Sequence, residues 1–219
     1  MTTSNRESVV GQVAAAGIVA VIRLTDPARL RAVVEAISEG GIRALEITMT
    51  VPGAVDLIRQ LAPGMPPGFL LGAGTVLDRD TALRVIDAGA QFVVSPVFRT
   101  AVIGACHERG VTAMPGCFTP TEILDAWDAG ADVVKVFPAT ALGPTFFKDV
   151  RGPLPQVKLM PTGGVTLDNA GDWIRAGAIA VGVGTALLDA GAIAAGDYGI
   201  LRANAERIVA NVRAARPAA

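Results

Sequence analysis

The chain has 219 residues, a formal net charge of −1 and 51% hydrophobic residues. This length suits a single domain, residues 1–219, with a sizeable core. The balanced charge gives no electrostatic reason to expect nucleic acid or a membrane surface as a partner. Two cysteines make no disulfide framework, and the first residues lack the basic and long apolar segments of a signal peptide, so a cytoplasmic location is expected.

Eight short apolar segments, rich in Val, Ile and Leu, alternate with helical stretches. We expect them as strands at 18–24, 44–49, 70–76, 92–97, 111–116, 133–139, 157–164 and 180–187. Most are apolar on both faces, which is typical of parallel strands covered by helices. Further helices are expected near 5–16 and 199–215. The pattern predicts an α/β fold, a single-domain (β/α)8 TIM barrel with an extra N-terminal helix, and a doubly wound open sheet is the main alternative.

Junctions between helices and strands repeat a glycine signal. It occurs in EGGIRALEI, DAGAQFVVS, ERGVTAMPG, DAGADVVKV and RAGAIAVGV. Glycine adopts the left-handed conformation that ends a helix. Asp26-Pro27 and Thr119-Pro120 mark helix starts, because a capping residue precedes a proline at the first helical position.

Lys135 is the first candidate catalytic residue. The chain has three lysines. Lys148 is expected on a helix and Lys158 at the start of a strand, and both are expected at the surface. Lys135 instead lies inside the apolar segment VVKVF. Burying an ammonium without a partner is unfavourable, and desolvation lowers a lysine pKa, which frees the amine to attack a carbonyl. A structural ion pair is the alternative.

Glu46 is the second candidate, because it interrupts the strand ALEITM. Strand alternation puts Glu46 and Thr48 on the face opposite Leu45 and Ile47. The same alternation sends Lys135 inward, so the carboxylate and the amine are expected to share the barrel interior. A buried salt bridge stabilises weakly, and proton transfer beside an imine-forming amine explains the pair better.

Polar groups and glycine turns fall at the ends of several expected strands. Arg23, Thr75, Pro96 and Thr162 lie there, where TIM barrels carry their catalytic residues. The turns PTGGV (161–165) and GVGTAL (182–187) follow the last two strands, and barrels often bind phosphate at these loops through backbone N–H groups. Ordinary tight turns are the alternative.

Metal chemistry is not expected. The lone histidine, His107, is expected to be a solvated surface residue on a helix. Cys106 and Cys117 lack the spacing of metal ligands and are expected to pack in the core. A zinc-type aldol mechanism therefore has no ligand set.

Eight collinear motifs run from about residue 10 to the C-terminus. They are GGIRALEITMTVPGA, GAGTV, GAQFVVSP, MPG-FTPTE, KVFPA, GP-FFKDVRGPLP-VK, PTGGV and AVGVGTAL. With them the chain resembles the 2-keto-3-deoxy-6-phosphogluconate aldolase family, whose members also cleave 4-hydroxy-2-oxoglutarate. The resemblance implies a homotrimer of TIM barrels that works without a cofactor. It also implies that Lys135 forms an imine with pyruvate and that Glu46 shuttles protons.

The resemblance also assigns substrate contacts. The substrate-facing positions are Thr75, Pro96 and Phe137, and the phosphate contacts are Thr162, Gly163, Gly164, Gly184 and Thr185. Some members carry an arginine, which helps to hold the substrate carboxylate, where this chain has Thr50. We therefore count Thr50 among the substrate-binding positions and expect Arg23 to supply the charge. The alternative for Arg23 is an outward ion pair with Asp26.

The expected function is that of a class I aldolase. It reversibly cleaves a 2-keto-4-hydroxy acid to pyruvate and an aldehyde, either glyceraldehyde 3-phosphate or glyoxylate. Two alternatives stay open at this point. One is another phosphate-binding barrel enzyme, such as an isomerase, decarboxylase or synthase, and the other is a ligand-binding barrel without catalysis.

Overall fold

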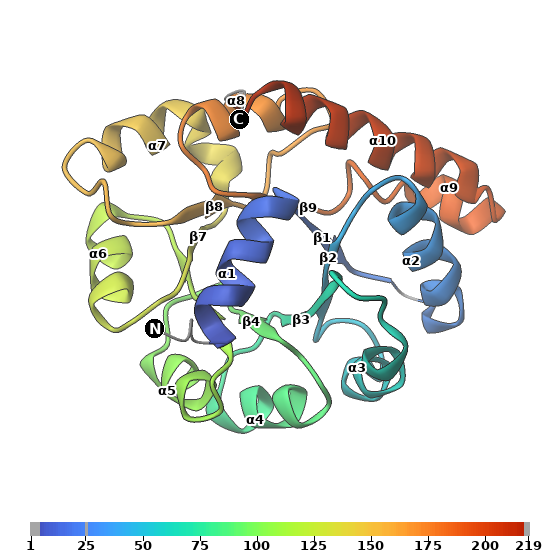
Figure 1. The fold of residues 1–219 in the computed structure, drawn as a ribbon, viewed down its shortest axis with the longest axis horizontal. Helices are drawn as coiled ribbons and strands as arrows, with labels where there is room; N and C mark the ends of the chain where they lie inside the picture. The colour runs from blue at the N-terminus through green and yellow to red at the C-terminus, as the bar shows by residue number, and fades with distance from the viewer. Residues whose placement is uncertain (1–4, 25, 217–219) are drawn as a thin grey trace.

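The strands of the computed structural model form an inner set of parallel ladders, and the helices lie around them (Figure 1). The structure describes residues 5–24 and 26–216. The strands are β1 (Ile18–Ile22), β2 (Ala44–Thr48), β3 (Leu70–Gly74), β4 (Phe92–Val94), β5 (Thr112–Met114), β6 (Gly116–Cys117), β7 (Val134–Val136), β8 (Leu159–Pro161) and β9 (Val181–Val183). Each lies within a segment expected to be a strand, apart from Cys117 of β6, but most of those segments extend further than the strand itself.

The strand order identifies the topology. One sheet has the order β5-β4-β3-β2-β1-β9 and the other the order β6-β7-β8. The last strand pairs with the first, whereas a doubly wound sheet reverses its order at a switch point, so that alternative is wrong. The expected strand 111–116 is interrupted at Pro115, which has no N–H to donate. The isolated bridge between Thr162 and Gly182 links β8 to β9. The fold is a TIM-type barrel whose hydrogen-bonded ladder is not continuous.

Apart from the first helix, which lies across one end of the strands, the helices surround the strands (Figure 1). They are α1 (Asn5–Ala16), α2 (Leu30–Glu39), α3 (Ala54–Leu61), α4 (Arg79–Asp87), α5 (Thr100–Glu108), α6 (Pro120–Asp128), α7 (Gly143–Arg151), α8 (Ala170–Arg175), α9 (Ala190–Ala195) and α10 (Tyr198–Ala214), with 3-10 turns η1 (Pro27–Arg29), η2 (Ala62–Gly64) and η3 (Ala139–Ala141). The expected first and last helices are confirmed. No helix in the described ranges is both long and apolar enough to cross a bilayer.

Local signals explain most boundaries. Thr119 caps α6 in a capping box with Glu122, as the Thr119-Pro120 pair predicts. The Asp26-Pro27 pair instead begins η1, and α2 starts only at Leu30, so that helix start is predicted too early. The glycines of the recurrent junction signal all have positive φ, between 64° and 108°: Gly41, Gly89, Gly110, Gly130 and Gly177.

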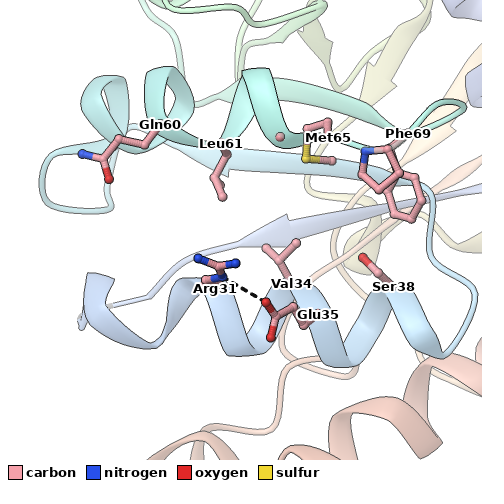
Figure 2. A pocket seen from close by; sticks show the side chains of 10 residues that line it. Arg31, Val34, Glu35, Ser38, Gln60, Leu61, Met65 and Phe69 are labelled. Carbon is pink, nitrogen blue, oxygen red and sulfur yellow. Dashed lines mark hydrogen bonds and ion pairs between the residues drawn. The ribbon is translucent and has the colours of Figure 1, made fainter.

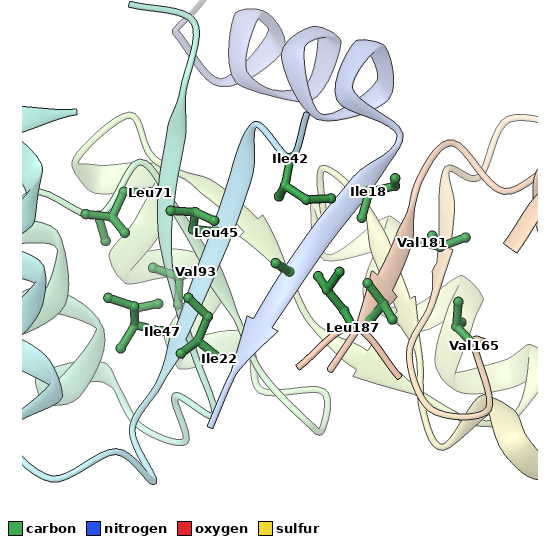
Figure 3. Packing of buried hydrophobic residues seen from close by; sticks show 14 of the residues in the cluster. Ile18, Ile22, Ile42, Leu45, Ile47, Leu71, Val93, Val165, Val181 and Leu187 are labelled. Atoms are coloured by element: carbon green, nitrogen blue, oxygen red, sulfur yellow. The ribbon is translucent and has the colours of Figure 1, made fainter. Parts of the chain in front are cut away.

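Strand alternation divides the apolar core in two. Outward residues such as Ile22, Leu45 and Ile47 pack against the helices (Figure 3). Inward residues such as Val19 and Ala44 form a smaller interior cluster. Three valines of α1 join that interior cluster and close the N-terminal end of the barrel: Val9, Val10 and Val13. The opposite, C-terminal end is therefore the side left for a site.

Candidate active site

Lys135 lies in the barrel interior, on the same face of β7 as the interior residue Val133. Its residue exposure is 2%, and its Nζ lies 5.1 Å from the centroid of the Phe137 ring. It makes no hydrogen bond or ion pair with any residue in 5–24 or 26–216. Lys148 is exposed on α7, and Lys158 is half-buried just before β8. Lys135 is therefore the one buried lysine among the three.

The surroundings of Lys135 favour its neutral form. Burial lowers the pKa of the Lys135 ammonium below its usual 10.5, the Glu46 carboxylate opposes this, and the Arg23 guanidinium adds to the lowering. Desolvation is the largest of these effects, because an ammonium loses its hydration in the interior. A neutral amine at the C-terminal end of a barrel is suited to attack a carbonyl carbon.

Glu46 is fully buried on the interior face of β2. Neither carboxylate oxygen has a hydrogen-bond partner within the described part of the chain. The side chain lies over Gly74, where an added Cβ would sit 1.8 Å from Oε1. Glu46 and Lys135 influence each other electrostatically, yet no ion pair joins them among the described residues, so the structural ion pair is not what the structure contains. An unpartnered carboxylate near an amine is free to exchange protons.

Gly74 lies against the candidate residue Glu46, a contact between two strands that sequence reasoning missed. It pairs in register with Thr48, the residue two positions after Glu46 on β2. The motif GAGTV contains the signal, since two glycines on one face of a strand leave room for a side chain from the neighbouring strand.

The positions expected to face the substrate lie at the C-terminal ends of β3, β4 and β7. Thr75 follows β3 with a φ of 59°, an uncommon conformation for a β-branched residue. Such strain concentrates at functional sites. Pro96 follows β4. A Cβ added to Gly116 would lie 2.4 Å from the carbonyl oxygen of Pro96, so only glycine fits at position 116. Phe137 follows β7 and forms a wall beside Lys135.

The two glycine turns lie side by side after β8 and β9. Thr162 has a buried hydroxyl with no partner among the described residues, and it bridges to Gly182. Gly163 and Gly164 have φ values of 90° and 72°. Their backbone N–H groups donate to no carbonyl within the described ranges. Free N–H groups in such a turn are suited to bind an anion.

The chain is similar to known proteins along most of its length. The family model described as KDPG and KHG aldolase matches residues 9–203. The chain belongs to this family. It is 38% identical over 181 residues to a probable 2-dehydro-3-deoxy-6-phosphogalactonate aldolase of Rhizobium meliloti (strain 1021), covering 82% of this chain and 85% of the relative. It is 39% identical to a 2-dehydro-3-deoxy-phosphogluconate aldolase of Treponema pallidum (strain Nichols), covering 74% and 78%.

A solved structure of a family member has a similar fold. The KDPG aldolase from Legionella pneumophila, captured with pyruvate as a covalent carbinolamine intermediate, superposes with a TM-score of 0.84 at 27% identity, covering 94% of this chain and 98% of that one. The protein is thus an aldolase, a carbon–carbon lyase. This decides against the other phosphate-binding enzymes and against a barrel without catalysis.

Thr50, the position where the resemblance implies an arginine in some members, lies two residues after the end of β2. The Thr48 hydroxyl donates to the Ile22 carbonyl at 3.1 Å and lies 2.7 Å from the Thr50 hydroxyl. Because the proton of Thr48 is already used, Thr50 donates its own proton to Thr48. The Thr50 oxygen is then left with acceptor capacity only. It has no remaining donor for a substrate carboxylate.

Arg23 lies just beyond the end of β1, on the same face as Val21 and the interior residue Val19. Its guanidinium Nη1 is 3.9 Å from the position of a Cβ on Gly184. Asp26 pairs with Arg29 at 3.1 Å, so the outward ion pair between Arg23 and Asp26 is not formed. Arg23 is exposed at the mouth of the aldolase and reaches toward the turn after β9.

His107 lies far from this mouth, and its expected solvated position is wrong. Its side chain is 27% exposed, and its Nε2 lies 3.7 Å from Asp132, which Arg6 of α1 binds at 2.7 Å. Burial is the main cause that lowers the pKa of His107 from its usual 6.5. The cluster joins α1 to the closed end of the barrel. Helical periodicity cannot show this, because Asp132 comes from a different element.

The cysteines pack in the core of the aldolase, as predicted. Cys106 and Cys117 are buried and free, and burial raises the pKa of each thiol to about 12. Neither is a thiolate at neutral pH. Among residues 5–24 and 26–216, no three His, Cys, Asp or Glu side chains gather as metal ligands would.

A separate groove of about 310 Å³ lies on the outside of the barrel, between α2 and the α3–η2 segment (Figure 2). Val34, Leu61 and Met65 form its apolar floor, and Arg31 and Glu35 pair at its edge. It contains no residue of the Lys135–Glu46 interior. The groove is therefore not part of the catalytic mouth.

Proposed function

We propose that this aldolase uses Lys135 as the imine-forming nucleophile and Glu46 as the proton-transfer residue. The observation that carries the proposal is a fully buried, unpartnered carboxylate in the same interior as a buried lysine of lowered pKa. Two uncompensated ionisable groups are unfavourable for stability, and such pairs concentrate at catalytic sites. The family match independently requires a carbon–carbon lyase at this fold.

The proposed cycle cleaves a 2-keto-4-hydroxy acid. The neutral Lys135 amine adds to the C2 ketone to give a carbinolamine, and loss of water leaves a protonated imine. A proton leaves the C4 hydroxyl, the C3–C4 bond breaks, and its electrons enter the imine to form an enamine. The aldehyde departs, C3 is protonated, and water releases pyruvate and free Lys135. Glu46 moves the protons at dehydration and at the C4 hydroxyl, directly or through water. The imine is the electron sink, so the reaction needs no cofactor.

We propose 2-keto-3-deoxy-6-phosphogluconate as the main substrate, with 4-hydroxy-2-oxoglutarate as a second. The products with pyruvate are glyceraldehyde 3-phosphate and glyoxylate, respectively. The unpaired backbone N–H groups after β8 support a phosphate subsite made of Thr162, Gly163, Gly164, Gly184 and Thr185. Relatives are named for both gluconate- and galactonate-derived acids, so steady-state kinetics on this panel identifies the preferred one.

Borohydride reduction in the presence of pyruvate tests the nucleophile. We expect one reduced pyruvyl group per chain, on the peptide that contains VVKVF. Lys148 and Lys158 serve as internal controls, because both lie outside the barrel interior. Labelling of either, or no labelling, contradicts the assignment of Lys135.

We further propose that the aldolase assembles as a homotrimer. Three large apolar side chains are exposed on neighbouring loops after β3, β4 and β6: Leu77 at 52%, Val97 at 44% and Phe118 at 38%. Exposed apolar side chains on neighbouring loops are typical of interaction surfaces. Sedimentation equilibrium should give three times the chain mass of 22.4 kDa. Leu77→Glu should dissociate the assembly and Ile200→Glu, which changes an exposed residue of α10, should not. A monomeric wild type contradicts the proposal.

A further inference from the structure

The strand β3 carries two glycines on its interior face, Gly72 and Gly74. They share this face with Leu70, which belongs to the interior cluster, whereas Leu71 and Ala73 face the helices. Neither glycine has a positive φ, so the backbone conformation does not require glycine at either position. What the two positions require is space, because a side chain from a neighbouring strand lies over each of them.

The two neighbours come from opposite sides of β3. A Cβ added to Gly72 would lie 2.3 Å from Cε2 and 2.4 Å from Cζ of the Phe92 ring, which belongs to β4. A Cβ added to Gly74 would lie 1.8 Å from Oε1 of Glu46, which belongs to β2. The ring and the carboxylate therefore occupy successive positions along the interior face of β3, with the carboxylate nearer to the C-terminal mouth.

The register of the strands shows that the Glu46 side chain is displaced along β3. Glu46 pairs with Gly72, not with Gly74, and Gly72 pairs in turn with Phe92. These three residues form one row across three strands, and the space over Gly72 is open to a side chain from either side. The Phe92 ring fills that space, so the carboxylate lies over Gly74 instead, two residues closer to the mouth.

Phe92 is suited to hold this arrangement. Its side chain is fully buried, and it packs in the interior cluster with Val94 and Met114. A ring packed on all sides yields little to its neighbours. Glu46 has three side-chain torsions, and its carboxylate oxygens have no hydrogen-bond partner within the described part of the chain. Packing rather than hydrogen bonding therefore fixes where the carboxylate lies.

We propose that Phe92 is a positioning residue for proton transfer, whose ring blocks the space over Gly72 and holds the Glu46 carboxylate at the mouth end of the interior. This inference rests on the proposed function, in which Glu46 moves the protons. Phe92 acts through Glu46 and not on the substrate. Without the ring, the glutamate side chain can turn down over Gly72, and the productive position of the carboxylate is less populated.

The first test is Phe92→Val. It removes the ring atoms that lie over Gly72 and keeps a β-branched residue, which suits a strand. We expect kcat to fall about ten- to a hundredfold, because misplacing a catalytic group by about 1 Å lowers the rate by about 10²-fold. Phe92→Leu, a smaller change, allows the same comparison if Phe92→Val does not fold.

The matched control is the same substitution in the outer core. Phe147 is also fully buried, but it lies on α7 and packs against Trp173, with the ring centroids 5.1 Å apart. Phe147→Val should lower the thermal stability, as Phe92→Val does, and leave kcat unchanged in the folded protein. The comparison separates loss of packing from loss of carboxylate position.

Two double variants give readouts that a purely structural role would not change. In the Glu46→Gln background, Phe92→Val should cause no further loss of kcat, because the ring acts through the carboxylate. Gly72→Ala alone overpacks against the ring. Combined with Phe92→Val, the alanine methyl group fills part of the vacated space, and kcat should recover part of what Phe92→Val loses.

Three results overturn the inference. They are full turnover in a folded Phe92→Val variant, an equal loss of kcat with glutamate and with glutamine at position 46, and no recovery in the combination with Gly72→Ala. Failure of the proposed function looks different. In that case Glu46→Gln itself keeps full turnover, whichever residue occupies position 92.

Discussion

Replacing Gly74 by alanine tests whether the position of the Glu46 carboxylate sets the rate of turnover. Gly74 is not among the residues with positive φ, so the backbone accepts alanine. The new Cβ would lie 1.8 Å from Oε1 and 2.5 Å from Cδ of Glu46. Non-bonded heavy atoms prefer separations of about 3.5 Å, so the carboxylate has to move by more than about 1 Å.

The displacement sets the expected size of the effect. Misplacing a catalytic group by about 1 Å lowers the rate by about 10²-fold. Overpacking costs about 1–3 kcal/mol of stability, against a total of about 5–15 kcal/mol for an ordinary domain. The variant should therefore remain folded at 25 °C while its kcat falls about a hundredfold.

The assay is a mutant cycle on kcat with Gly74→Ala, Glu46→Gln and the double variant. Glu46→Gln should lose about 10²- to 10⁴-fold, the usual contribution of general acid–base catalysis. Because both changes act on one carboxylate, the double variant should be no slower than Glu46→Gln alone. Gly104→Ala is the control, since its Cβ would meet nothing within 4 Å. Full turnover in a folded Gly74→Ala variant, or losses that multiply in the double variant, would refute the reasoning.

Two further predictions concern pH and metals. Burial lowers the pKa of Lys135 and Glu46 raises it, so removing the carboxylate in Glu46→Gln should lower this pKa further and keep the amine neutral at lower pH. The acid limb of cyanoborohydride trapping should therefore move to lower pH, and a move to higher pH contradicts the electrostatic argument. EDTA should leave kcat unchanged, because the imine is the electron sink; a loss that a divalent ion restores rules out the class I mechanism.

Local sequence rules account for the barrel and for the two interior ionisable groups. The two-residue alternation of a strand fixes which face a side chain takes, so the sequence by itself assigns Glu46 and Lys135 to one interior. Glycine junctions with positive φ likewise follow from short-range sterics. Strand ends are less determined, because β-branched and apolar residues continue beyond β3 and β9 into loops. Only hydrogen-bond pairing with a neighbouring strand decides where a strand stops.

Contacts between distant segments required the tertiary structure. The approach of Gly74 to Glu46 depends on the register of β3 against β2, and the cluster of Arg6, His107 and Asp132 joins three separate elements. The direction of Arg23 is the clearest case. Alternation gives its face, but a long flexible side chain at the end of a strand can turn to several partners. Asp26 already forms an ion pair with Arg29, and Gly184 lies next to Arg23 at the end of β9. These two tertiary contacts decide where the guanidinium of Arg23 lies.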